Sequence, residues 1–217
     1  MLSFTEENYL KTMFNLSQET GEISVNDLSK ALDIKMPTVN SMVKKLDDKG
    51  LVTYQSYKPL KLTEDGVTTA LQIIRKHRLT EMFLVNKMGF GWEEVHEVAE
   101  QIEHIDSPKF FAKMDEMLDF PKVDPHGSPI PDALGNMDWK FYEALSNFNV
   151  GDKLRLVAIS NSNQEFLKYL TSKGLKLNTT IEIKSKEEFD QSLTVQFNDQ
   201  ISILSLKATK KLLVEKI

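Results

Sequence analysis

Apolar residues in the first 50 positions repeat every three to four residues, which is the spacing of amphipathic helices. The first helix is expected to begin with a capping box at residues 3–6 and to run to about residue 17. Ser24 is a typical N-cap for a second helix. After a short turn, Pro37 should open a third helix, which Gly50 ends.

Two short segments with alternating apolar and polar residues follow, at positions 51–54 and 60–63. The residues between them, Gln55 to Pro59, form a mainly polar tip, so the pattern predicts a β-hairpin. Helix, helix, turn, helix and hairpin is the element order of a winged helix-turn-helix, which lays its third helix in the DNA major groove. We therefore expect residues 1–63 to form a DNA-binding domain.

Helical spacing then returns and predicts a second, helical domain over residues 64–137. A long helix should begin at Thr63 and its following acids and run to about residue 87, and another should cover roughly residues 92–105. A third should start at Ser107-Pro108 and end near Phe120. Residues 121–137 hold four prolines and two glycines and should form a loop and linker.

Beyond residue 148 the apolar pattern changes to a period of two, which is typical of strands. The predicted strands lie at Leu154 and Leu156, Ile181 and Ile183, Leu193 to Phe197, and Ile201 and Ile203. One helix is expected at about 163–173. Residues 148–217 should therefore form a small β-barrel domain, and the fold class as a whole is mainly α with a small β part.

Composition narrows the functional classes. The apolar runs are far shorter than the roughly 18 residues that span a bilayer, and the N-terminus lacks the layout of a signal peptide. We therefore expect a cytoplasmic protein that does not contact membranes. The chain has no cysteine, which excludes disulfides, thiolate metal sites and cysteine nucleophiles. Any metal site must use nitrogen and oxygen ligands.

The net charge of −5 conceals a strong segregation of charge. Residues 26–62 hold seven lysines and four aspartates, a net charge of +3. Residues 81–120 hold ten acidic residues and three lysines, a net charge of −7. The sequence thus predicts a basic module followed by an acidic one.

The third predicted helix has apolar residues on one face and small polar or basic residues on the other. Small side chains let the backbone approach bases, and lysines neutralise phosphates. The residues expected to contact DNA, with one from the hairpin, are Lys35, Pro37, Thr38, Asn40, Ser41, Lys44, Lys45 and Lys58. No arginine lies between residues 26 and 62, so specificity must come from weaker base contacts, DNA shape and dimer spacing. The alternative is an ordinary solvated helix face.

All four histidines lie between positions 77 and 126, around the acidic segment. His77 and Glu81 share a helix face, and so do the residues His96, Glu100, Glu103 and His104. Such groups are costly to bury unpaired, but around a divalent cation their charge and lone pairs become useful. The alternative is a solvated acidic face, because histidine–glutamate pairs at this spacing also stabilise helices.

Several motifs carry a family resemblance. Residues 75–79 read RKHRL, Glu103-His104 follows a helical segment, residues 124–131 read DPHGSPIP, and residues 7–10 read ENYL. Together they resemble the DtxR/MntR family of metalloregulators over essentially the whole chain. The resemblance implies a winged helix-turn-helix, a helical metal-binding and dimerisation domain, and a C-terminal SH3-like, FeoA-type β-barrel.

The resemblance also implies two metal sites. The primary site would use Asn8, Glu100, Glu103 and His104. The second would use His77, Glu81 and His96, with Asp124 or His126 as alternatives and with Glu165 of the third domain completing it. Asn8 departs from the family, which has methionine there in iron sensors and aspartate in manganese sensors. A neutral amide should loosen this site or make it more selective.

Oxygen-rich ligands favour Mn²⁺, with Fe²⁺ second. The resemblance implies a repressor, not an enzyme, that binds a palindromic double-stranded operator as a homodimer when loaded with metal and controls metal-uptake genes. Apolar residues that could form the dimer interface or the core are Phe83, Leu84, Phe110 and Phe111. The alternatives are a winged-helix regulator that responds to a non-metal signal and a metal-dependent hydrolase.

Overall fold

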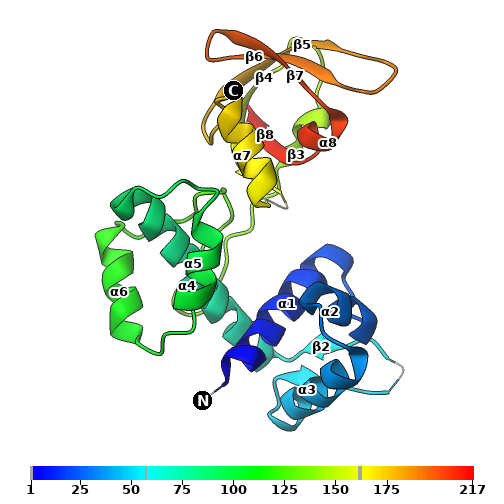
Figure 1. The fold of residues 1–217 in the computed structure, drawn as a ribbon, viewed down its shortest axis with the longest axis vertical. Helices are drawn as coiled ribbons and strands as arrows, with labels where there is room; N and C mark the ends of the chain where they lie inside the picture. Colours follow the sequence, from blue (N-terminus) through cyan, green and yellow to red (C-terminus); the bar gives the residue numbers. More distant parts are fainter. Residues whose placement is uncertain (1, 57, 161–162) are drawn as a thin grey trace. The chain divides into compact units, whose positions relative to one another are not determined.

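The structure is a computed structural model that describes residues 2–56, 58–160 and 163–217 (Figure 1). The chain divides into two compact units. The first contains residues 1–77, 100–111 and 131–137, and the second contains residues 78–99, 112–130 and 138–217. None of the described helices is both long and apolar enough to cross a membrane. The expected division into three domains stays a prediction.

Three helices and a hairpin open the first unit (blue to cyan in Figure 1). They are α1 (Phe4–Thr20), α2 (Val25–Leu32), α3 (Met36–Asp48), β1 (Val52–Thr53) and β2 (Lys61–Leu62). The capping box at Ser3 begins α1, and Ser24 caps α2, as the sequence predicts. α1 continues past residue 17 and ends at Gly21, whose φ of 74° is left-handed. The predicted winged helix-turn-helix is confirmed.

The apolar faces of these elements pack into one core. It includes Tyr9, Leu10, Met13 and Phe14 from α1, Leu28 from α2, Val39, Val43 and Leu46 from α3, and Val52 and Leu60 near the hairpin. The hairpin is antiparallel and shorter than expected, with Val52 opposite Leu62. Tyr57 of the expected tip lies outside the described residues.

Thr63 joins the hairpin to α4 (Glu64–Met88). Its hydroxyl donates to the carbonyl of Gly50 at 2.7 Å and accepts from the backbone N–H of Gly66 at 3.0 Å. A Cβ at Gly66 would lie 1.9 Å from the carbonyl oxygen of Leu51. The start of α4 can therefore approach the chain before β1 this closely only because residue 66 is glycine.

Two shorter helices follow, α5 (Val95–Ile102) and α6 (Pro108–Met117). Both helices are shorter than the sequence predicts: α5 was expected over residues 92–105, and α6 was expected to end near residue 120. α6 cannot continue because Asp119 and Phe120 have left-handed φ angles of 58° and 55°. Among the apolar residues that could form a dimer interface, Leu84 and Phe111 are buried and Phe110 is exposed.

The C-terminal part of the second unit is an antiparallel sheet of six strands in the order β3-β8-β4-β5-β6-β7. The strands are β3 (Glu143–Ala144), β4 (Lys153–Ile159), β5 (Thr180–Lys186), β6 (Leu193–Phe197), β7 (Gln200–Leu204) and β8 (Leu212–Lys216). The helices are the 3-10 helix η1 (Leu145–Asn147), α7 (Gln164–Ser172) and α8 (Leu206–Thr209). The four predicted strands and the predicted helix are confirmed, whereas β3, β8 and α8 were not predicted.

Changing Gly66→Ala should destabilise the protein, although glycine to alanine inside a helix usually stabilises by about 1 kcal/mol. The added methyl would force the Leu51 carbonyl and the hairpin away from α4. We expect a loss of at least about 1 kcal/mol in the free energy of unfolding, measured by urea denaturation. Thr68→Ala, at an exposed position of the same helix, is the control. An unchanged or raised stability of the Gly66 variant would contradict the close approach.

Candidate metal centre

Three helices of the first unit meet at one buried glutamate, Glu103. It directly follows α5, and its side chain has no exposed surface. One carboxylate oxygen accepts a hydrogen bond from Lys11 of α1 at 2.6 Å, and the other lies 2.5 Å from Nδ1 of His77 on α4. The carboxylate of Glu103, which follows α5, therefore contacts side chains of both α1 and α4.

The environment of Glu103 keeps it ionised. Burial by itself would raise the pKa of Glu103, but the hydrogen bond from His77 and the charge of Lys11 outweigh burial and lower the pKa. Glu100, one turn earlier on α5, accepts from the same ammonium at 2.6 Å and lies 3.7 Å from His77. Ligand atoms of His77, Glu100 and Glu103 all lie within 4.8 Å of one another, which is close enough to hold one cation.

His104 is positioned by the beginning of α1. Its Nδ1 lies 2.5 Å from a carboxylate oxygen of Glu7, and its ring stacks on Phe4 with centroids 4.7 Å apart. Its Nε2 lies 3.7 Å from Glu103. A carboxylate that holds one imidazole nitrogen sets the tautomer and the ring orientation, as is common for histidines that bind metals. Because Glu7 contacts Nδ1, it leaves Nε2 of His104 available to coordinate a metal ion.

Asn8 carries a buried side-chain oxygen that has no hydrogen-bond partner among the residues that the structure describes. An unsatisfied buried acceptor costs about 1–3 kcal/mol. Its helix neighbours Glu7 and Lys11 both contact the segment around Glu103. An amide oxygen, two carboxylates and an imidazole are ligands that hard divalent cations accept. Among the described residues, however, the imidazole grouped with Glu100 and Glu103 is His77, and the predicted His104 belongs to none of the groups.

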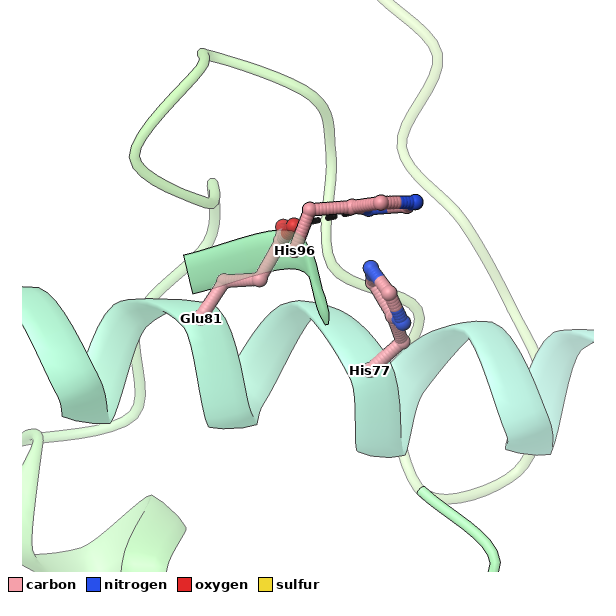
Figure 2. Close-up of side chains that lie close together, drawn as sticks. All are labelled: His77, Glu81 and His96. Atoms are coloured by element: carbon pink, nitrogen blue, oxygen red, sulfur yellow. Dashed lines mark ion pairs between the residues drawn. The ribbon is translucent and has the colours of Figure 1, made fainter. Parts of the chain in front are cut away.

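A second cluster lies in the second unit around Glu81 of α4. Ligand atoms of Glu81, Asp124 and His126 lie within 4.8 Å of one another, and all three residues are buried. His96 of α5 lies 3.5 Å from Glu81, but its side chain is 67% exposed. Figure 2 shows Glu81 and His96 together with His77, which stands one turn before Glu81 on α4.

Asp124 shapes the loop that carries His126. One carboxylate oxygen accepts from the backbone N–H groups of His126 and Ser128 at 2.8 and 2.9 Å. Burial and the nearby charge of Glu81 raise the pKa of Asp124. The imidazole of His126 donates from Nε2 to the carbonyl of Trp92 at 2.9 Å, and its Nδ1 lies 3.7 Å from Glu81. The loop therefore places the carboxylate of Asp124 and the imidazole of His126 close to Glu81.

All but one of the remaining predicted site residues are exposed. Glu165 is exposed at the start of α7, and none of the groups of possible metal ligands found among the described residues includes it. On α3 and the turn before it, the residues expected at the DNA are exposed except Asn40, which is half-buried. The exposed residues are Lys35, Pro37, Thr38, Ser41, Lys44 and Lys45, together with Lys58 of the hairpin.

Glu6 links the first turn of α1 to α3. Its buried carboxylate lies 2.6 Å from Lys49, just past the end of α3, and 3.2 Å from Lys45, and it accepts from the backbone N–H of Ser3 at 2.7 Å. Burial acts to raise the pKa of Glu6, but the hydrogen bonds from Lys49, Ser3 and Lys45 outweigh it and lower the pKa to about 2. Part of the positive charge of α3 is therefore balanced within the protein.

Family models match three consecutive segments of the chain. Residues 1–60 match the iron dependent repressor N-terminal DNA binding domain, residues 63–132 match its metal binding and dimerisation domain, and residues 144–216 match the FeoA domain. A solved structure described as a manganese-dependent transcriptional repressor in complex with manganese is similar, with 31% identity, a TM-score of 0.86, and coverage of 98% of this chain and 100% of that chain. The chain belongs to the iron-dependent repressor (DtxR) family.

Curated members of the family match over different lengths. The iron-dependent repressor IdeR of Mycobacterium tuberculosis is 36% identical over 127 residues, which are 58% of this chain and 55% of that protein. In this match the chain spans about half the length of its relative. The diphtheria toxin repressor of Corynebacterium efficiens is 29% identical over 194 residues and covers 84% of each chain. The family resemblance and the fold class predicted from the sequence are confirmed.

Two residues that contact the candidate ligands around Glu103, Glu7 and Lys11, were not predicted from the sequence. They are four residues apart on α1, on either side of Asn8, so helical spacing alone could have grouped them on one face. Their contacts to residues some 90 positions later could not be inferred from spacing. The pairing of His77 with Glu103 was not expected. The sequence pattern grouped His77 with Glu81 and His96, and ligand atoms of these three residues also lie within 4.8 Å of one another.

Changing Glu6→Gln should lower the free energy of unfolding at neutral pH by about 1–2 kcal/mol, because it removes the charge that the partly exposed Lys45 and Lys49 face. The pKa of Glu6 is lowered from 4.5 to about 2, so its stabilisation is complete above pH 4.5 and is lost as the pH falls toward 2. The difference between wild type and variant in urea denaturation should shrink over this range. The exposed Glu22→Gln is the control, and a difference that does not change with pH would contradict the ion pair.

Proposed function

We propose that this chain is a transcriptional repressor whose DNA binding depends on a divalent cation, with Mn²⁺ or Fe²⁺ as co-repressor. The observation that carries the proposal is the buried side-chain oxygen of Asn8, which lacks a hydrogen-bond partner in the described part of the chain. Asn8 lies in the segment that matches a DNA-binding domain, whereas Glu103 and His104 lie in the segment that matches a metal-binding domain. One ligand set would therefore span both.

The primary site would consist of Asn8, Glu100, Glu103 and His104. A cation bound there supplies the positive charge that lets two carboxylates, an amide oxygen and an imidazole share one place. Hard oxygen ligands favour Mn²⁺, and Fe²⁺ follows. The manganese complex of a similar repressor supports the first ion, and the iron-dependent relatives support the second.

A second site would form around Glu81. Its contacts support Asp124 and His126 as partners, and His96 would join from the exposed side. We propose that His77 acts mainly by holding Glu103, because the two side chains are 2.5 Å apart. The exposed position of Glu165 gives no support to its role as a ligand.

Cation binding would control DNA binding through α1. Glu7 and Lys11 of α1 contact His104 and Glu103, while Glu6 forms ion pairs with Lys45 and Lys49 of the α3 region. A cation that binds ligands of both α1 and the Glu103 segment favours the conformation in which α1 is held against that segment. The coupling between cation binding and this conformation is typically about 1–3 kcal/mol. Glu6 then carries the position of α1 to the helix that reads DNA.

The repressor would act as a homodimer in the cytoplasm. Two copies present two α3 helices, which match the halves of a palindromic double-stranded operator about one helical turn apart, or a multiple of this distance. The family match to a dimerisation domain supports this assembly. Metal-uptake genes are the targets that the family resemblance implies.

The alternative is a winged-helix regulator that responds to a non-metal signal. The ion pairs of Lys11 with Glu100 and Glu103 favour it, because they satisfy both carboxylates without a metal. DNA binding that neither a chelator nor added Mn²⁺ changes would support this alternative. We do not propose an enzyme such as a metal-dependent hydrolase, since the clusters share the chain with a complete DNA-reading module.

Changing Glu103→Ala should abolish the Mn²⁺ dependence of DNA binding, because it removes the carboxylate common to the α1, α4 and α5 contacts. The probe is a duplex selected from a random library with Mn²⁺-loaded protein, titrated with and without chelator. We expect wild-type affinity to rise about tenfold or more with Mn²⁺, and the variant's affinity to stay constant. Glu97→Ala, at an exposed position of α5, should behave as wild type. A full Mn²⁺ response in the Glu103 variant would refute the primary site.

Changing Lys44→Ala should weaken DNA binding about equally for all sequences, because an exposed lysine on α3 neutralises a phosphate. The slope of log affinity against log salt concentration should fall in magnitude by about one for each phosphate contact that the substitution removes. Lys109→Ala, an exposed lysine on α6, is the matched control. An unchanged slope for the Lys44 variant would contradict the assignment of α3 as the DNA-reading helix.

A further inference from the structure

The ammonium group of Lys11 lies between two candidate metal ligands. Its Nζ is 2.6 Å from Glu100 and 2.6 Å from Glu103. The Lys11 side chain is only 13% exposed, so this is not an ordinary surface ion pair. Such charge-assisted hydrogen bonds in a partly buried setting are stronger than those on the surface.

The position of Lys11 has two consequences. First, it provides a link between α1 and α5 that needs no metal, because the lysine belongs to one helix and Glu100 to the other. Second, a divalent ion cannot share both carboxylates with a nearby ammonium without strong repulsion between the two positive charges. Asn8 adds no negative charge to offset this repulsion.

We propose that Lys11 is a built-in cation that competes with the metal for Glu100 and Glu103. It holds α1 to α5 when metal is scarce, and it must leave the carboxylates when an ion binds to both of them. Lys11 therefore raises the metal concentration at which the regulator responds. This inference rests on the proposed function, since it concerns the same primary site.

The test compares wild type with Lys11→Met and Lys11→Gln in the full chain, with Lys30→Met, an exposed lysine of α2, as the control for lost charge. All of these proteins, including the one called wild type in this comparison, also carry Glu81→Gln. This background substitution removes the central carboxylate of the second cluster, so that Mn²⁺ binding reports on the primary site. Mn²⁺ affinity is measured by titration calorimetry. Hydrogen exchange of the α1 amides is measured in chelator and again with Mn²⁺.

Both Lys11 variants should bind Mn²⁺ roughly tenfold more tightly than wild type, the factor that corresponds to 1.4 kcal/mol. In chelator their α1 amides should exchange faster than those of wild type, and Mn²⁺ should restore the protection. The Lys30 variant should match wild type in both measurements. Mn²⁺ binding that appears only after Lys11 is replaced would also support the competition.

Equal Mn²⁺ affinity in wild type and both Lys11 variants would overturn the role of Lys11 but leave the metal-dependent repressor intact. Unchanged exchange of the α1 amides in chelator would overturn the metal-free link. A failure of every protein to bind Mn²⁺ would overturn both this inference and the primary site. The two variants differ in polarity, so a folding defect in one leaves the other to decide.

Discussion

The arrangement of the first unit depends on the need to compensate one buried negative charge. Glu103 has no exposed side-chain surface, and a buried carboxylate without partners is strongly destabilising. Lys11 and His77 each supply a partner to one of its oxygens. Because these partners come from α1 and α4, the ionised glutamate determines how three helices meet.

Local patterns predicted most of the secondary structure. Capping residues such as Ser3 and Ser24 and the helical spacing of apolar residues identified α1, α2 and α3. The strand β8 was missed because its order in the sheet, between β3 and β4, depends on partners distant in sequence. The end of α6 was predicted too late because the left-handed residues Asp119 and Phe120 override helical spacing. The limits of α5 were also predicted too wide.

The candidate site was predictable in its residue types but not in its contacts. Glu103 and His104 could be singled out because imidazoles and carboxylates recurred on one helix face. Their partners on α1 could not, because Glu7 and Lys11 are ordinary helix-surface residues until the fold brings them to α5. The charge pattern was similarly incomplete: the sequence predicted a basic helix, and Glu6 offsets part of that charge from a neighbouring helix.

The absence of sulfur from both clusters has a chemical consequence. Their candidate ligands are carboxylate and amide oxygens and imidazole nitrogens, and the chain has no cysteine. Thiolates are the groups that peroxide converts first to sulfenic and then to irreversible sulfinic acids. A site made from these ligands offers peroxide no cysteine thiolate to oxidise, so this one route of chemical damage to the coordinating atoms does not apply to it.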